Sequence, residues 1–197
     1  HRMTKLTHLR ARDYRRLRWK NDGGWTTEIA RDPAGDGDFR WRISIADIES
    51  DGPFSAFPGV ARDLVLLAGT GIELDIGDAP ALRMTERFQR AHFDGEARVD
   101  CRLLAGPTRD FNVMARRDAV RAEVVARPLV GSMVLFAETG VVWIAHAFSG
   151  HAHARVGEES VALATGDTLR IDFADRSAGR VVIEGGGELV LVRLAPT

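Results

Sequence analysis

Apolar and polar residues alternate with a period of two along most of this chain, in short runs that end at Gly, Pro, Asp or Asn. The run RWRISIADI, residues 40–48, is the clearest example, and similar runs recur as far as ELVLVRL, residues 188–194. This period is typical of β-strands, which turn successive side chains to opposite faces of a sheet. Many short strands separated by turns predict a sandwich or a barrel.

A helical period is almost absent. The best helix candidate is RARDYRRLRW, residues 10–19, and KNDGG would end it after two turns. We therefore predict an all-β protein with very little helix, below about 10% of the residues.

The two halves of the chain resemble each other in pattern. LVLLAGTGIELDI (64–76) and WIAHAFSGHAHARV (143–156) each give a strand, a glycine-containing turn and a returning strand. Such an internal repeat predicts two small β-barrels, over residues 4–117 and 118–197. No Ser- or Gly-rich linker separates them, so we expect them to pack as one unit. The opening residues 1–3 are interpreted as a tag remnant ending at the natural first Met.

Composition narrows the class of partner. The 27 Lys and Arg residues nearly balance the 28 Asp and Glu residues, which argues against a nucleic-acid partner. No apolar run reaches the ~18 residues of a membrane span, and no signal peptide is visible, so we expect a cytoplasmic protein without a membrane partner. Cys101 is the single cysteine, which excludes an internal disulfide, and its strand pattern predicts a buried thiol.

One strand face carries a candidate binding group. Alternation places Arg42, Ser44 and Ala46 together, so that a guanidinium and a hydroxyl adjoin a small residue. The planar donor fork of arginine matches a carboxylate. The alternative is that Arg42 is solvent-exposed or pairs with an internal acid such as Glu28.

Two further segments offer polar groups. In WKNDGGWTTEI, residues 19–29, a tight turn brings Lys20 and Asn21 to the start of a strand that carries Glu28. In RDFNVMARR, residues 109–117, Asn112 lies on the face opposite the apolar side chains. Each segment could equally be an ordinary hairpin or a strand with one exposed polar side.

The segment HAHARVGEESVALATGD, residues 151–167, resembles a cupin metal motif. His151 and His153 face the same way on a strand and Glu158 follows, a donor set that suits a divalent transition metal. No histidine follows Gly166, however, so the third histidine of the motif is missing. We therefore expect no metal and no other cofactor, with a site at these three residues as the alternative.

Four segments resemble the HutD/Ves family, in the family's order and over residues 6–194. They are WKNDGGWTTEI, residues 41–74, FDGEARVDCRLLAGPTRDFNVMARR and GDTLRID. The resemblance implies a bicupin that is often a homodimer and a regulatory role in bacterial histidine utilisation. It also implies a small carboxylate ligand such as urocanate or formylglutamate. The family's motif residues carry over onto Lys20, Asn21, Glu28, Arg42, Ser44, Phe54, Ser55, Phe57, Arg62, Asp110, Asn112 and Arg116. The family's Asn-Gly-Gly-Gly has Asp22 at its second position here, and aspartate tolerates left-handed angles.

The resemblance suggests a use for the loop of residues 51–59. Its two prolines stiffen it, Phe54 and Phe57 form the wall of a barrel mouth, and Ser55 offers a hydroxyl. Arg42 and Arg62 would then meet a carboxylate, although Arg62 could equally pair with a nearby acid, Asp63 or Glu73.

Three functions remain open on the sequence. The leading one is a non-catalytic sensor that binds a small carboxylate metabolite. The alternative is a cupin-type enzyme, using either a metal at His151, His153 and Glu158 or, without metal, Lys20 and Glu28 as base and acid. The third is a scaffold for another protein of the pathway.

Overall fold

The structure, a computed structural model, describes residues 4–197, and the interpreted tag remnant lies outside that range. The described residues form sixteen β-strands and two short 3₁₀ helices, Ala11–Asp13 (η1) and Arg176–Ala178 (η2). Within the same range, no helix has the length and apolar character needed to cross a membrane.

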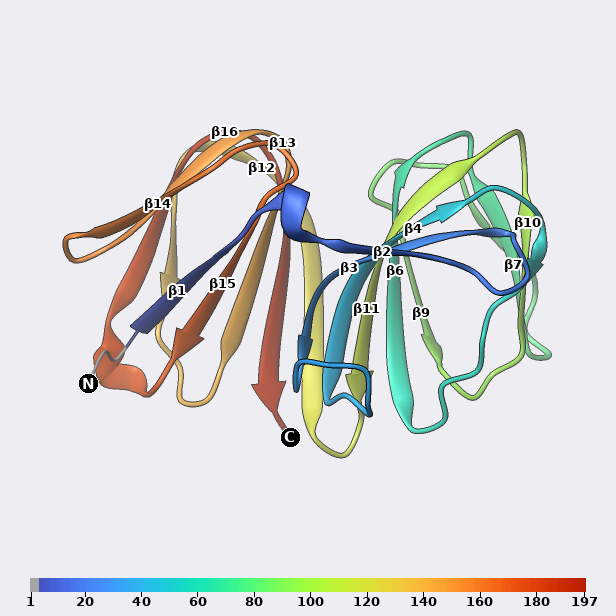
Figure 1. Ribbon diagram of the computed structural model, residues 1–197, viewed down its shortest axis with the longest axis horizontal. Helices are drawn as coiled ribbons and strands as arrows, with labels where there is room; N and C mark the ends of the chain where they lie inside the picture. The colour runs from blue at the N-terminus through green and yellow to red at the C-terminus, as the bar shows by residue number, and fades with distance from the viewer. Residues whose placement is uncertain (1–3) are drawn as a thin grey trace. The chain divides into compact units, whose positions relative to one another are not determined.

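The backbone contacts divide the chain into two units. The first unit is Arg15–Val120, and the second combines Arg121–Thr197 with the segment that ends at Tyr14. The division near residue 120 lies close to the predicted join at 117/118. The first residues differ from the prediction, because β1 (Thr4–Leu9) pairs along its full length with β15 (Thr168–Phe173), as Figure 1 shows in dark blue and red-orange. This pairing assigns the start of the chain to the second unit.

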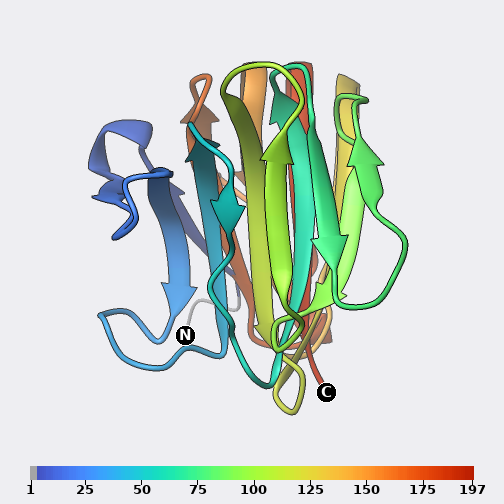
Figure 2. The same cartoon turned by 90° about the vertical axis from the view of Figure 1, so that its right-hand side faces the viewer.

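The first unit contains two sheets. The larger has the order β2-β3-β4-β11-β6-β9 and the smaller β5-β10-β7-β8. Figure 2 shows the cyan and green strands of this unit side by side. Leu64, Leu66, Ile72 and Leu74 are fully or almost fully buried in its core. The strands are β2 Arg15–Arg18, β3 Gly24–Asp32, β4 Trp41–Ile48, β5 Gly52–Pro53, β6 Val60–Ala68, β7 Ile72–Ile76, β8 Leu82–Met84, β9 Arg90–Asp94, β10 Val99–Leu103 and β11 Thr108–Arg116.

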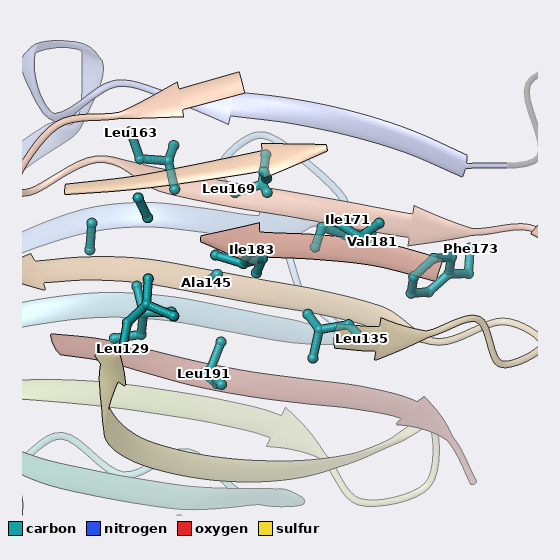
Figure 3. Packing of buried hydrophobic residues seen from close by; sticks show 14 residues of the cluster. Leu129, Leu135, Ala145, Leu163, Leu169, Ile171, Phe173, Val181, Ile183 and Leu191 are labelled. Atoms are coloured by element: carbon teal, nitrogen blue, oxygen red, sulfur yellow. The ribbon is translucent and has the colours of Figure 1, made fainter. Parts of the chain in front are cut away.

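The second unit is built on one sheet of order β1-β15-β13-β16-β12, with β14 paired to β13. Its core includes Leu169, Ile171, Ile183 and Leu191, which Figure 3 shows gathered along these strands. The remaining strands are β12 Val120–Phe136, β13 Val142–Val156, β14 Glu159–Leu163 and β16 Arg180–Pro196.

The predicted helix over residues 10–19 is wrong. Only η1 is helical there, and β2 follows it as an extended strand paired with β3. A tertiary contact holds the turn, since the Tyr14 hydroxyl donates to the carbonyl of Gly166 at 2.7 Å. The strand then stacks Arg16 and Arg18 over the Trp25 ring, at 4.2 and 5.1 Å from its centroid. These pairings outweigh local helix propensity.

The prediction for Cys101 is confirmed. Its side chain is buried in β10, and this burial raises the pKa of the thiol to about 12. Cys101 therefore packs as a small apolar residue rather than acting as a nucleophile.

Candidate functional site

Mostly polar side chains form three rows across one face of the larger sheet of the first unit. The strands β3, β4, β11 and β6 are in antiparallel register, so residues two apart on each strand share this face. The rows are Thr26–Ala46–Asp110, Glu28–Ser44–Asn112 and Arg42–Met114–Arg62. The face therefore combines two guanidiniums with two carboxyls, an amide and two hydroxyls.

This face borders a cavity of about 520 Å³. Nine of the ten residues predicted to bind a ligand line it, namely Lys20, Asn21, Arg42, Ser44, Phe54, Ser55, Phe57, Arg62 and Asn112. The tenth, Glu28, instead lines a neighbouring cavity of about 590 Å³, in which Arg42 and Phe57 also take part. The structure thus brings together a set of residues that the sequence spreads over more than ninety positions.

Arg42 pairs with Glu28 and also borders the cavity. Its Nε donates to Glu28 Oε1 at 2.9 Å, and the two side chains are only 18% and 13% exposed. The same guanidinium lines the cavity, and within residues 4–197 no hydrogen-bond acceptor meets its two terminal amino groups. Arg42 is therefore held by an acid on one side and remains available to an anion on the other.

Arg62 is more deeply buried and has weaker hydrogen bonds. The residue is 6% exposed, and its guanidinium donates to the Ser55 carbonyl at 3.3 Å and to Asn112 Oδ1 at 3.4 Å. Its Nε has no partner among the described residues. Burial lowers the pKa of Arg62 to about 10, so that it remains charged at neutral pH. The predicted alternatives for Arg62 are wrong, because Asp63 pairs with His92 and Glu73 with Arg102.

Aromatic rings surround this guanidinium. The rings of Phe54, Phe57 and Phe93 lie with their centroids 5.1–5.6 Å from the Arg62 guanidinium carbon. Ring faces attract a cation but offer it no hydrogen-bond acceptor. The charge of Arg62 is thus stabilised while most of its donors remain unsatisfied.

Asp110 lies on the same face, completely buried. Its Oδ1 accepts a hydrogen bond from Asn112 Nδ2, and its Oδ2 has no partner in the described part of the chain. Burial raises the pKa of Asp110 to about 7, against the opposing effects of the Arg62 charge and the Asn112 bond. Among the motif residues, Asp110 lines the cavity although it was not predicted to bind a ligand, whereas Arg116 lines the neighbouring one.

Comparison with known proteins identifies the family. The HutD family model matches residues 11–191. The chain belongs to the HutD family. A protein of the hutC 3′ region of Pseudomonas putida is 38% identical over 197 residues, 98% of each chain, and protein Ves of Citrobacter koseri is 40% identical over 107 residues, covering 54% of this chain and 56% of Ves. The HutD/Ves resemblance predicted from the sequence is therefore confirmed, and the P. putida relative connects the family with a histidine utilisation locus.

Solved structures agree with this assignment. HutD from Pseudomonas fluorescens SBW25 (formate condition) superposes with a TM-score of 0.81 at 32% identity, over 98% of this chain and 100% of that one. A conserved protein from Pseudomonas aeruginosa PAO1 gives 0.85 at 30% identity, over 98% of both chains. Escherichia coli YhhW, a cupin-fold protein, gives 0.73 at 10% identity, which shows the fold alone. The predicted all-β, cupin-like fold is confirmed.

The sequence missed several residues that line the cavity of this HutD-family chain. Trp19 is the most prominent, since its indole Nε1 donates to Thr26 Oγ1 at 2.8 Å and its ring meets Phe54 edge-on at 6.4 Å. It lay in the segment predicted to be helical, whereas strand parity had already placed Ala46 on the correct face. The other missed residues are Leu17, Arg18, Pro53 and Met114.

The turn before β3 follows the expectation for an Asp in the family motif. Asp22 has a left-handed φ of 58°, and Asn21 Oδ1 accepts a hydrogen bond from the amide of Gly23 at 2.9 Å. A Cβ at Gly24 would lie 2.3 Å from the Asp47 carbonyl oxygen, so a side chain there would displace β4. The side chain of Asn21 therefore caps the turn while it borders the cavity.

The alternative metal residues lie in the second unit of this HutD-family chain. His151 and His153 are exposed on β13, and Glu158 is exposed in the turn that follows. Among residues 4–197, no group of three or more His, Cys, Asp or Glu side chains is arranged to hold a metal ion. Two exposed imidazoles without a third donor form an incomplete set for the cupin motif.

Proposed function

We propose that the first unit binds a small carboxylate metabolite of histidine breakdown, and that this binding serves regulation rather than catalysis. The observation that carries the proposal is Arg62, a buried guanidinium that lines the cavity and is short of hydrogen-bond acceptors. Leaving buried donors unsatisfied costs free energy, and a ligand carboxylate that supplies the acceptors relieves this cost.

The remaining lining supports the same ligand class. Arg42 adds a second cationic group, and Ser44 and Asn112 add a hydroxyl and an amide. Trp19 and Phe54 provide apolar walls for a planar or aliphatic body. The volume of about 520 Å³ is in the range usual for small-molecule sites. Urocanate and N-formyl-L-glutamate are small enough to enter a cavity of this volume, and the hutC-region relative favours this pathway.

The same geometry disfavours acid–base catalysis by the predicted residues. Lys20 is exposed at the first cavity, whereas Glu28 lines the second and is engaged by Arg42 at 2.9 Å. A general acid and a general base must both reach the reacting atoms of one substrate. A sensor therefore accounts for the arrangement better than a metal-free isomerase or lyase.

The test is a thermal-shift and calorimetric screen of urocanate and N-formyl-L-glutamate, each beside its uncharged amide. Both carboxylates should be examined, and at least one should stabilise the protein, by about 2.7 kcal/mol at a hundredfold excess over Kd. The corresponding amide should have little effect, and NMR should recover the bound compound unchanged. Stabilisation by neither carboxylate, or equal stabilisation by the amides, would contradict carboxylate binding. Turnover of the compound would contradict the non-catalytic role.

A further inference from the structure

Three side chains form a connected chain beneath the cavity. Arg62 donates to Asn112 Oδ1 at 3.4 Å, and the amide nitrogen of Asn112 donates in turn to Asp110 Oδ1. Both ends of this chain are incomplete, because Arg62 Nε and Asp110 Oδ2 are buried without a hydrogen-bond partner among the described residues. Burying a carboxylate with one oxygen unsatisfied is costly, and burying its neutral, protonated form costs less.

The charged and titratable groups around Asp110 are few. Arg62 of β6 is the cation whose charge acts on it, and Asp47 of β4 adds a like charge while it forms an ion pair with Arg109 at 2.8 Å. Cys101 of β10 also faces Asp110, and burial raises the pKa of its thiol to about 12, so the thiol remains neutral. Around neutral pH, Asp110 is therefore the group in this cluster that can change its charge.

We propose that Asp110 couples anion binding in the cavity to the uptake of one proton, and so makes the affinity of the site depend on pH. This inference rests on the proposed function, because it takes the ligand carboxylate to contact Arg62. An ionised Asp110 repels that carboxylate, because both negative charges then lie beside the single positive charge of Arg62. When the ligand binds, Asp110 takes a proton from the solvent, and a single negative charge then remains beside the guanidinium.

The mechanism gives Asp110 a positioning role. Asp110 borders the cavity, but its carboxyl group is completely buried, so it acts on the ligand through Asn112 and Arg62. Burial already raises the pKa of Asp110 to about 7 before any ligand is bound. A second negative charge raises this pKa further, and linkage requires that anion affinity falls as pH rises above the pKa of the free protein.

Calorimetric titration with N-formyl-L-glutamate tests this coupling, because its carboxyl groups remain ionised from about pH 6 to about pH 8.5. In two buffers of different ionisation enthalpy, the wild-type protein should take up close to one proton per ligand near pH 8. The Kd should rise by up to about tenfold per pH unit above pH 7. The substitution Asp110→Asn, which mimics the protonated acid, should abolish both effects and retain the affinity of the wild type at low pH.

Asp63→Asn is the matched control. Asp63 is a second buried acid, on β6 directly after Arg62, but it pairs with His92 at 3.0 Å and does not line the cavity. This variant should keep the wild-type pH profile. Two results would overturn the coupling but not the proposed function: ligand binding without proton uptake, or a pH dependence of Kd in Asp110→Asn that equals that of the wild type. Loss of the pH dependence of Kd in Asp63→Asn would also overturn the coupling but not the proposed function. Absence of binding of both N-formyl-L-glutamate and urocanate at every pH would overturn the proposed function together with the coupling. The wild-type calorimetry decides the matter even if a variant fails to fold.

Discussion

Replacing Arg42 by alanine should weaken carboxylate binding without unfolding the protein. The substitution removes the terminal amino groups that border the cavity and the 2.9 Å bond from Nε to Glu28. A charge-assisted hydrogen bond is worth about 1.5–3 kcal/mol, which corresponds to a loss of about ten- to a hundredfold in affinity. The ion pair is 18% and 13% exposed, so its loss should cost about 1–2 kcal/mol of stability, between typical surface and buried values.

Calorimetric titration with N-formyl-L-glutamate and urea unfolding measure the two effects separately. Arg42→Lys should recover part of the affinity, because lysine keeps the charge and loses the donor fork. Arg40→Ala is the control, since Arg40 is 53% exposed, pairs with Asp32 and lines neither cavity. Unchanged affinity in Arg42→Ala would refute the place of Arg42 in the site. An unfolded variant would show that the pair with Glu28 is structural.

Three further predictions concern groups away from Arg42. The double substitution His151→Ala and His153→Ala should keep the fold and ligand binding, as measured by circular dichroism and calorimetry, and simultaneous loss of a bound metal and of binding would contradict this. A thiol reagent should label Cys101 only after unfolding, because the thiol is buried and its pKa is about 12, and fast labelling of native protein would disprove the expectation. The raised pKa of Asp110 makes the folded state bind more protons than the unfolded state, so the free energy of unfolding of the wild type should fall by a few kcal/mol as pH rises from about 4 to about 7. Urea titrations should show that Asp110→Asn lacks this decrease.

The all-β architecture could be predicted because its signals are local. Period-two alternation and turn residues are visible within a few positions of each strand, and RWRISIADI does contain β4. The segment over residues 10–19 could not be predicted in this way, because β2 depends on pairing with β3 and on the Trp25 ring. The place of β1 likewise depends on its pairing with β15, more than 150 residues further along the chain.

The composition of the candidate site was predictable to a similar extent. Strand parity identified the side chains that share a face, and the family motif selected most of those that border the cavity. The relative importance of the arginines was not visible, because it depends on burial and on partners distant in sequence. Arg42 pairs with Glu28, whereas Arg62 packs against three aromatic rings and makes only long hydrogen bonds. The unsatisfied carboxyl of Asp110 is likewise a property of packing that its neighbours in sequence do not reveal.

The most direct test of carboxylate binding in the first unit uses the indole N–H signals in a ¹H–¹⁵N NMR titration with N-formyl-L-glutamate and, separately, urocanate. Trp19 lines the cavity and bonds to Thr26, whereas Trp143 lies on β13 of the second unit. We predict that at least one of the two carboxylates shifts the Trp19 signal saturably and leaves the Trp143 signal in place. An unmoved Trp19 signal with both compounds, or a response confined to Trp143, would contradict the account.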